Sequence, residues 1–213
     1  MKIAIFGATG IVGKAVVEEA LEKGYEVTVL TRDAHKVTSR HANLHIVEGD
    51  VTDAAVVRSV VEGQDAVIQT LGIGGKGNGK PTTFVSEANR LIMKQMKAAG
   101  VTRLVAVSVI GAGDSRNFLP GIYRAVVMPL CMRWFMAIID DKNRMEASIA
   151  GSGLRWTVVR CTTVKQRRPT GHVVASYDGK GLKFSISAAD MAAFMVGTLR
   201  DDRYIGRIPT ISN

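Results

Sequence analysis

The sequence predicts a single-domain α/β fold in which a doubly wound parallel sheet carries helices on both faces. β-rich runs alternate with segments of helical periodicity along the chain. The β-rich runs are continuously apolar, which is typical of strands buried on both faces of a parallel sheet. A length of 213 residues suits one well-buried core and leaves little room for a second lobe. We therefore expect residues 1–213 to form one domain.

The first expected strand, residues 3–6, leads through a glycine-rich loop into a helix over residues 14–23. The loop is Gly7-Ala8-Thr9-Gly10-Ile11-Val12-Gly13, and its glycine spacing differs by one residue from that of most dinucleotide folds. In such a loop the first glycine allows a tight turn, the second lets the backbone approach a phosphate, and the third lets the helix pack closely. The amino end of the helix offers free N–H groups to an anion. The loop therefore indicates a site for a dinucleotide pyrophosphate.

Strands and helices continue to alternate after Gly24, which is well placed to end the first helix. The further expected strands cover residues 25–30, 44–47, 65–71, 103–109 and 154–160. The further expected helices cover residues 51–62, with Thr52 as the possible N-cap, and residues 83–99, 140–150 and 188–199. A capping box from Ser187 to Asp190 precedes the last helix. Right-handed crossovers would bring the carboxyl ends of the strands together at a ligand crevice.

Residues 118–139 form an apolar segment that two prolines and two arginines interrupt, which excludes a membrane-spanning helix. We expect residues 115–139 to form a lid or a core helix pair on the substrate side. A dimer face and an interfacial membrane helix are the alternatives. The expected oligomeric state is a monomer or a homodimer.

Lysine and arginine outnumber the acidic residues, with 28 − 19 = +9 charges. These charges are spread along the chain without a basic helix, so we expect a solvated basic surface and an anionic cofactor, and no nucleic acid partner. The amino-terminal sequence has no cleavable signal pattern, so we expect a cytoplasmic protein without an integral membrane segment. Cys131 and Cys161 are expected to be free buried thiols, and no metal site is expected.

The end of the second expected strand carries residues that select the cofactor. An NAD-dependent protein has an acidic residue here for the ribose 2′-hydroxyl, whereas this chain has Thr31-Arg32-Asp33. Arg32 can pair with a 2′-phosphate and Thr31 can donate to the same group, so the sequence favours NADP. The alternative is a surface arginine beside an acidic neighbour. Asp50 is expected either at the adenine edge or as the N-terminal cap of the following helix.

Two further strand ends are expected at the same crevice. Leu71-Gly72 ends the fourth strand and opens a glycine-rich loop over residues 72–79. We expect Lys76 in this loop, and Lys80 after it, to be solvated, and contact with phosphate or substrate is the alternative. Ser108 ends the fifth strand, where its hydroxyl would face the nicotinamide and a bound carbonyl. The alternative is a serine that only ends a strand.

Together these motifs resemble the atypical short-chain dehydrogenase/reductase superfamily in its NmrA-like branch, and they are most similar to its flavin-reducing biliverdin reductase B family. The matching pieces are Ile5-Phe6-Gly7-Ala8-Thr9-Gly10, residues 24–30 with Arg32-Asp33, Gly49-Asp50-Val51, residues 63–68, Pro81-Thr82-Thr83 and Ser152-Gly153-Leu154. They cover nearly the whole chain except residues 115–139. The resemblance implies a Rossmann-like fold with cofactor contacts from Gly7, Thr9, Gly10, Ile11, Val12, Gly13, Thr31, Arg32, Asp50, Val51, Leu71, Gly72, Ser108 and Arg160, and with residues 160–163 closing the substrate side.

The sequence differs from this family at positions that carry catalytic or substrate-side residues. The usual Tyr-x-x-x-Lys pattern would need a tyrosine four residues before Lys142, and that position is Ile138. Lys142 and Glu146 match a Lys-x-x-x-Glu pattern of related members, so we expect Lys142 either in the site or in an exposed i,i+4 pair. Cys161 stands where a proline commonly follows the Val-Arg of the sixth strand.

A missing tyrosine does not abolish hydride transfer, because a reduced flavin or similar conjugated ring takes protons from water. The resemblance therefore implies an NADPH-dependent reductase of a small conjugated acceptor, with Ser108 and Lys142 as the catalytic residues. The alternative is a non-catalytic, NADP-binding redox-sensing regulator. Nucleotide-sugar epimerase chemistry would need a substrate lobe for which the chain has little room.

Overall fold

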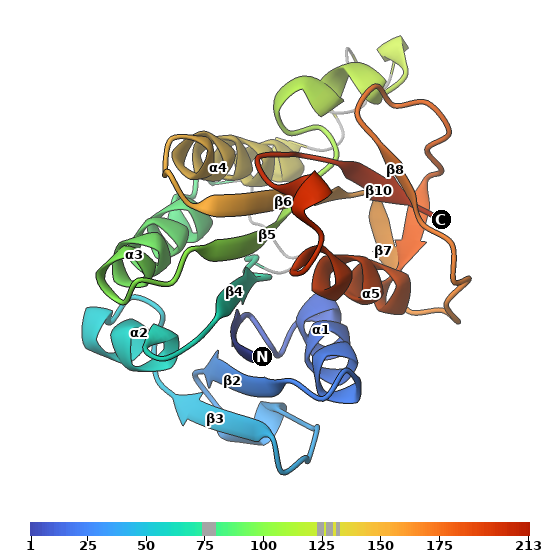
Figure 1. Cartoon of the computed structure of the whole chain (residues 1–213). Coiled ribbons are helices and arrows are strands. Elements are labelled where there is room, and N and C mark those ends of the chain that lie inside the picture. Colours follow the sequence, from blue (N-terminus) through green and yellow to red (C-terminus); the bar gives the residue numbers. More distant parts are fainter. Residues whose placement is uncertain (74–79, 123–125, 127–129, 131–132) are drawn as a thin grey trace.

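The computed structural model describes residues 1–73, 80–122, 126, 130 and 133–213. Its main sheet contains the strands β1 (Lys2–Phe6), β2 (Glu26–Thr31), β3 (Leu44–Glu48), β4 (Ala66–Gln69), β5 (Arg103–Val109), β6 (Arg155–Cys161), β8 (Val174–Ser176) and β10 (Thr210–Ser212). Their order in these described residues is β3-β2-β1-β4-β5-β6-β10-β8 (Figure 1). Neighbours from β3 to β10 pair in parallel, and β8 pairs antiparallel with β10. The predicted Rossmann-like parallel sheet is confirmed.

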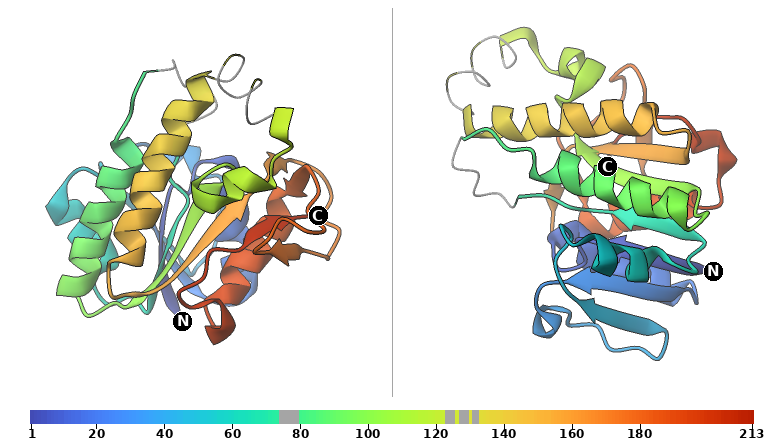
Figure 2. Two further views of the ribbon diagram at one scale, coloured as in Figure 1. Left: turned by 90° about the horizontal axis from the view of Figure 1, so that it is seen from above. Right: turned by 90° about the vertical axis from the view of Figure 1, so that its left-hand side faces the viewer.

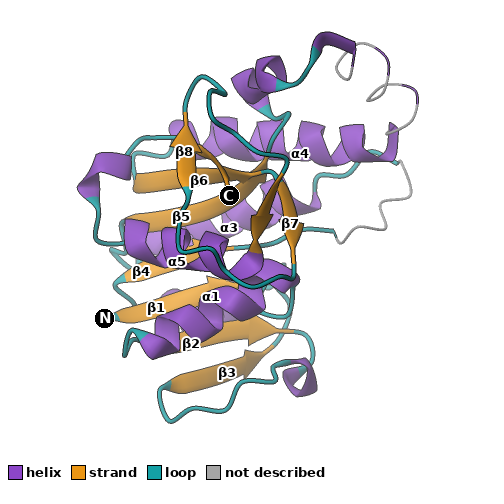
Figure 3. Cartoon of the chain, turned by 90° about the vertical axis from the view of Figure 1, so that its right-hand side faces the viewer, coloured by secondary structure: helices purple, strands orange, loops and turns teal. Residues whose placement is uncertain are grey.

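Helices cover both faces of this sheet. α1 (Ile11–Glu22) and α5 (Ala188–Thr198) pack together on one face (Figure 3). α2 (Ala54–Val61), α3 (Phe84–Ala98) and α4 (Arg133–Ala150) lie on the opposite face (Figure 2). Along β1, Ile3 and Ile5 belong to the core beneath α1 and α5, whereas Ala4 and Phe6 belong to the core beneath α2, α3 and α4. The central strands β1, β4 and β5 are largely apolar because both of their faces are buried, whereas the edge strand β3 has exposed polar residues.

Several short elements have no counterpart among the predicted ones. β7 (Thr163–Lys165) and β9 (Ser185–Ser187) form a second, two-stranded sheet in the described part of the chain. 3-10 turns occupy η1 (Ala34–Lys36), η2 (Gly113–Phe118) and η4 (Asp202–Tyr204). The strands β7, β8, β9 and β10 have three residues each, which is too short for a hydrophobic period to be recognised.

The start of α2 corrects one prediction. Asp53, and not Thr52, is the N-cap, because Asp53 Oδ1 accepts from the N–H groups of Ala55 at 2.8 Å and Val56 at 3.3 Å. Thr52 instead donates to Asp50 Oδ1 through its N–H and its hydroxyl, at 2.8 Å and 2.7 Å. Asp50 therefore closes the turn before the helix, and its predicted alternative role as the helix cap is wrong. Aspartate and threonine both cap helices well, so the sequence alone does not distinguish these three residues.

Two other helix ends agree with their predicted signals. Gly24 follows α1 with a φ of +73°, a left-handed conformation that glycine adopts at no steric cost. Ser187 Oγ caps α5 by accepting from the Asp190 N–H at 3.0 Å. No helix within the described ranges is both long enough and apolar enough to cross a membrane.

α4 begins earlier than predicted, at Arg133 instead of Asp140. Residues 133–139 contain no glycine or proline, so the helix continues back into the segment that we expected to form a lid. Residues 123–125, 127–129 and 131–132 of that segment, with Cys131, lie outside the described residues. The same holds for residues 74–79, with Lys76.

Candidate functional site

The order of the strands reverses between β1 and β4. Thr70 follows β4, and it donates to the Phe6 carbonyl through its N–H at 2.8 Å and through its hydroxyl at 3.0 Å. The connections that leave the two strands run to opposite faces of the sheet, since α1 lies on one face and α3 on the other. In open α/β sheets such a reversal leaves a crevice outside the carboxyl ends of the strands, where ligands bind.

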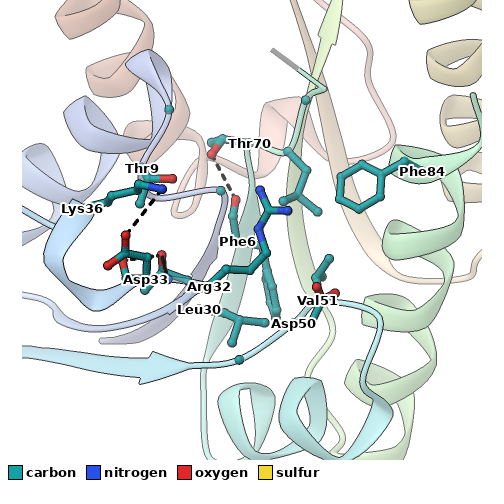
Figure 4. A pocket seen from close by; sticks show the side chains of 16 residues that line it. Phe6, Thr9, Leu30, Arg32, Asp33, Lys36, Asp50, Val51, Thr70 and Phe84 are labelled. Atoms are coloured by element: carbon teal, nitrogen blue, oxygen red, sulfur yellow. Dashed lines mark hydrogen bonds and ion pairs between the residues drawn. The ribbon is translucent and has the colours of Figure 1, made fainter.

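A pocket lies at this crevice (Figure 4). Its walls come from the ends of β1, β2, β3 and β4 and from the first residue of α3. The lining residues are Phe6, Gly7, Thr9, Gly10, Leu30, Thr31, Arg32, Asp33, Lys36, Gly49, Asp50, Val51, Thr70, Leu71, Gly72 and Phe84. Among the residues that we expected to contact the cofactor, the pocket includes Gly7, Thr9, Gly10, Thr31, Arg32, Asp50, Val51, Leu71 and Gly72. It does not include Ile11, Val12, Gly13, Ser108 or Arg160.

The three glycines of the first loop have different surroundings. Gly7 has a φ of +91°, and a Cβ there would lie 2.7 Å from Thr70 Oγ1. A Cβ on Gly13 would lie 2.1 Å from the Gly7 carbonyl oxygen, so no larger residue fits between helix and loop. At Gly10, by contrast, the nearest atom to such a Cβ would be 3.5 Å away. Gly7 and Gly13 are therefore required by packing within the protein, whereas Gly10 leaves space on the pocket side.

Gly10 is also the N-cap of α1 and has no side chain with which to cap it. The first N–H groups of this 12-residue helix are thus left without a side-chain acceptor at the pocket. The positive end of the helix dipole lies at the same place. This arrangement fits a phosphate group.

Charged side chains line the pocket at the end of β2. Arg32 is exposed and extends into the pocket, as Figure 4 shows. Lys36, on η1, lies 3.4 Å from Asp33 as measured between Nζ and Oδ2. Thr31 is buried, and its hydroxyl donates to the Asp33 carbonyl at 3.0 Å, which holds the turn after the strand. Lys36 was missed by the sequence analysis, although its position three residues after Asp33 is a signal that could have pointed to it.

Asp50 faces this group from the end of β3. Hydrogen bonds from the backbone and side chain of Thr52 lower the pKa of Asp50, and the charge of Arg32 lowers it further. Asp50 is therefore a carboxylate at neutral pH. Leu30, Val51 and Phe84 add apolar surface to the same part of the pocket. Phe84 was also missed, because nothing in the sequence shows that the first residue of α3 reaches the end of β3.

Lys142 lies on α4, outside the pocket lining, and its side chain is buried. Its ammonium donates to the carbonyls of Leu71 at 3.0 Å and Val107 at 2.7 Å. Burial lowers the pKa of Lys142 to about 8, although the nearby Cys161, Asp141 and Glu146 favour the charged form. Because Leu71 lines the pocket, Lys142 connects to its edge through this carbonyl.

Of the two roles expected for Lys142, the alternative of an exposed i,i+4 pair with Glu146 is wrong. Both side chains are buried, and Glu146 binds the guanidinium of Arg160 through two hydrogen bonds, at 3.0 Å to Nε and 2.7 Å to Nη2. The i,i+4 spacing correctly places Lys142 and Glu146 on one face of the helix, but that face is turned towards the sheet.

Ser108 and Arg160 are neighbours in the register of β5 and β6. Ser108 is fully buried on the face of the sheet that α4 covers, and its hydroxyl is without a hydrogen-bond partner in the described structure. Arg160 also donates to the exposed Asp114 at 2.5 Å. Burial lowers the pKa of Arg160, but its hydrogen bonds with Glu146 and Asp114 outweigh this effect and raise it overall. The structure thus places Arg160 in an ion-pair cluster beside the pocket.

Cys161 follows Arg160 and is a free, buried thiol, as predicted. Burial raises the pKa of Cys161 to about 11 against the influence of Lys142, so the thiol stays protonated and is a poor nucleophile. In the parts of the chain that the structure describes, no three metal-ligating side chains come together.

Comparison with known proteins gives a family match over nearly the whole chain. The model of the NAD(P)H-binding family matches residues 7–202. An uncharacterised chloroplastic protein of Arabidopsis thaliana is 30% identical over 207 residues, which cover 93% of this chain and 71% of that protein.

Solved structures share the fold at low sequence identity. The oxidoreductase YlbE of Lactococcus lactis superposes with a TM-score of 0.80 at 21% identity, over 100% of this chain and 91% of that one. ChuY of Escherichia coli O157:H7, described as an anaerobilin reductase, superposes with a TM-score of 0.79 at 22% identity, over 100% and 97% of the two chains.

Proposed function

The chain belongs to the NAD(P)H-binding family, and from this premise we propose that it is an NADPH-dependent reductase of a flavin or a similar conjugated acceptor, such as a tetrapyrrole. One observation carries the proposal. The pocket joins an anion-binding helix end at Gly10 to two cations, Arg32 and Lys36, at the end of β2. The fold shared with an oxidoreductase and with an anaerobilin reductase supports the reaction class.

The pocket residues suit the parts of NADPH in turn. The amino end of α1 would bind the pyrophosphate, with space left by Gly10 for close approach. Arg32 and Lys36 would bind the 2′-phosphate through charge-assisted hydrogen bonds. Leu30 and Phe84 would enclose the adenine ring, and the Asp50 carboxylate would accept from its amino group.

Bound in this way, NADPH supplies a hydride. Lys142 binds one carbonyl after β4 and one in β5, so it holds together the two strand ends near which the nicotinamide would lie. The Ser108 hydroxyl is unpaired but fully buried and outside the pocket lining, so it would bind an acceptor only if the acceptor reached the end of β5 beyond the described pocket. The protein's task is then to align the reactants and exclude water, as a conjugated acceptor requires.

Ile138, in place of the usual tyrosine, favours a second candidate function. A non-catalytic regulator would bind NADPH through the same residues and would need no group to deliver a proton. It would therefore bind the cofactor without consuming it.

NADPH consumption tests the reductase proposal directly. We expect wild-type protein to oxidise NADPH with at least one of FMN, riboflavin, quinones or tetrapyrroles, followed by the absorbance of the reduced nicotinamide. Ser108→Ala should slow the reaction while leaving the fold intact, because it removes an unpaired buried hydroxyl. Tight NADPH binding without turnover of any acceptor would reject the reductase and favour the regulator.

A further inference from the structure

Lys142 lies between two carboxylates that do not bind it. Asp141 precedes it on α4, and Glu146 lies one turn further along the helix. The ammonium of Lys142 donates instead to two backbone carbonyls, and its next polar contact among the described residues is the Met145 sulfur at 4.0 Å. A buried ammonium with two acids nearby would ordinarily pair with one of them.

Each of the two carboxylates binds a different group. Asp141 accepts from the N–H groups of Val85 at 2.9 Å and Ser86 at 3.1 Å, so it satisfies the amino end of α3. Glu146 accepts two hydrogen bonds from the Arg160 guanidinium. Such charge-assisted, two-bond pairs are roughly twice as strong as hydrogen bonds between neutral groups.

The hydrogen bonds from Arg160 determine the direction in which the Glu146 carboxylate points. Lys142 and Glu146 are four residues apart on one helix face, a spacing at which opposite charges meet. Both side chains are buried, so Glu146 would turn to Lys142 if its own partner were removed. The other charged or titratable groups around Lys142 are Asp141 on its own helix and Cys161 on β6, while β5 and the residues after β4 present carbonyls.

We propose that Arg160 is a positioning residue, which holds the Glu146 carboxylate away from Lys142 and so leaves the Lys142 ammonium with backbone acceptors alone. The value of this arrangement rests on the proposed reductase function. Among the described residues, one N–H of the Lys142 ammonium has no strong acceptor. In the reductase it would give that proton to an acceptor bound beside Leu71, whose carbonyl Lys142 contacts at the pocket edge, as the acceptor takes up the hydride. The neutral amine then regains a proton from water, so two electrons and two hydrogens reach the acceptor in total.

Lys142 is suited to this task because burial brings its pKa to about 8, close to neutral pH. An ion pair with Glu146 would raise that pKa and hold the proton more tightly. Gly113 packs directly against the Arg160 guanidinium. A Cβ at this position would lie 2.3 Å from Arg160 Nη2, so no larger residue fits there. The other partner of Arg160, Asp114, is 72% exposed and contributes little to the buried charge balance.

The pKa of Lys142 in the cofactor-free protein tests the proposal without any activity measurement. Carbon-13-labelled lysine gives a side-chain signal that can be followed against pH, with Lys142→Arg used for assignment. Arg160→Met should raise the pKa of Lys142 by about one or more, because it releases Glu146 and removes a like charge. Arg160→Met combined with Glu146→Gln should return the pKa to the wild-type value or below, since no carboxylate is then released.

Asp114→Asn is the matched control, because it removes a partner of Arg160 but leaves the pair with Glu146 intact. It should leave the Lys142 signal unchanged. If Arg160→Met does not fold, Arg160→Lys replaces it, because a lysine cannot hold Glu146 by two parallel hydrogen bonds and should give a smaller rise.

An unchanged Lys142 pKa in the Arg160 variants, or a rise that Glu146→Gln does not reverse, would overturn the positioning role. Absence of NADPH turnover in the wild-type protein would instead reject the reductase function. The pKa comparison would still decide what Arg160 does, so the two failures are distinguishable.

Discussion

The proposed NADP preference depends on single side chains at the end of β2. Arg32 and Lys36 both line the pocket, and Arg32 is exposed. Arg32→Ala should weaken NADPH binding about 10- to 100-fold, the effect of losing a charge-assisted hydrogen bond of roughly 1.5–3 kcal/mol. NADH lacks the 2′-phosphate, so its affinity should change little. Calorimetric titration of both cofactors measures the difference.

Arg90→Ala is a suitable control for this experiment, since Arg90 is exposed on α3 and lies outside the pocket lining. It should leave both affinities at the wild-type level. If Arg32→Ala weakens NADPH and NADH equally, Arg32 does not recognise the 2′-phosphate.

Lys142 should make stability depend on pH in a defined direction. The folded pKa of about 8 lies below the ordinary lysine value of 10.5, so between these values the unfolded chain binds more protons than the folded one. The cost of burying the charge is therefore present below pH 8 and disappears as pH rises towards 10.5. Its size is on the order of 3 kcal/mol.

Lys142→Met removes this cost together with the ammonium. Its free energy of unfolding, relative to wild type, should be most favourable at pH 7 and should fall steadily as pH approaches 10. Urea unfolding of both proteins across this range provides the test. A difference that stays constant with pH would mean that the folded pKa of Lys142 is not lowered.

Individual site residues were predictable where they follow directly from the end of a strand. Thr9, Arg32, Asp50 and Leu71 are of this kind, and all four line the pocket. The exposed pairing expected for Lys142 was wrong, because helical spacing shows which residues share a face but not whether that face meets the sheet. The Arg160 cluster joins β6, α4 and η2, and such contacts between distant segments leave no local pattern in the sequence.

At the scale of elements, two substitutions in the β1–α1 region should have different effects, one on cofactor binding and the other on the stability of the fold. Gly10→Ala places a methyl group where the nearest protein atom is 3.5 Å away, so the cost to stability should be below about 1 kcal/mol. The same methyl group occupies space that the phosphates need, so NADPH affinity should fall at least about tenfold. Thermal unfolding and cofactor titration measure the two effects.

Gly13→Ala is the contrasting variant, because its methyl group would lie 2.1 Å from the Gly7 carbonyl oxygen. It should destabilise the fold by at least about 1–3 kcal/mol, as overpacking does. Equal loss of stability in the two variants would contradict the assignment of open space to Gly10.

Helices and strands were predictable where the sequence has a clear hydrophobic pattern or a residue that marks a helix end. The other elements were not. β5 has the predicted bounds, and Gly24 and Ser187 mark helix ends as expected. The start of α2 was misplaced because Asp50, Thr52 and Asp53 compete as caps within four residues. The three-residue strand β10 depends on its pairing with the longer β6, so its own sequence does not reveal it.

At the scale of the molecule, the reversal of strand order gathers residues that are far apart in the chain. Thr9, Arg32, Asp50 and Leu71 belong to four separate crossovers and meet in one pocket because parallel strands present their carboxyl ends at one edge. The meeting of these strand ends at one edge of the sheet was predictable, since right-handed crossovers and buried parallel strands permit few arrangements. The edge formed by β10 and β8 was not, because β10 depends on pairing with β6 and β8 on pairing with β10.

Hydrogen–deuterium exchange with and without NADPH tests the location of the cofactor most directly. The pocket predicts slower exchange in peptides that cover residues 7–13, 30–36, 49–51 and 70–72, because the bound cofactor would order these four strand ends together. Peptides of η4, which lies beside the first residues of β6 at the opposite end of the strands, should exchange at the same rate in both states. Protection confined to other regions, or no protection at saturating NADPH, would contradict the proposed site.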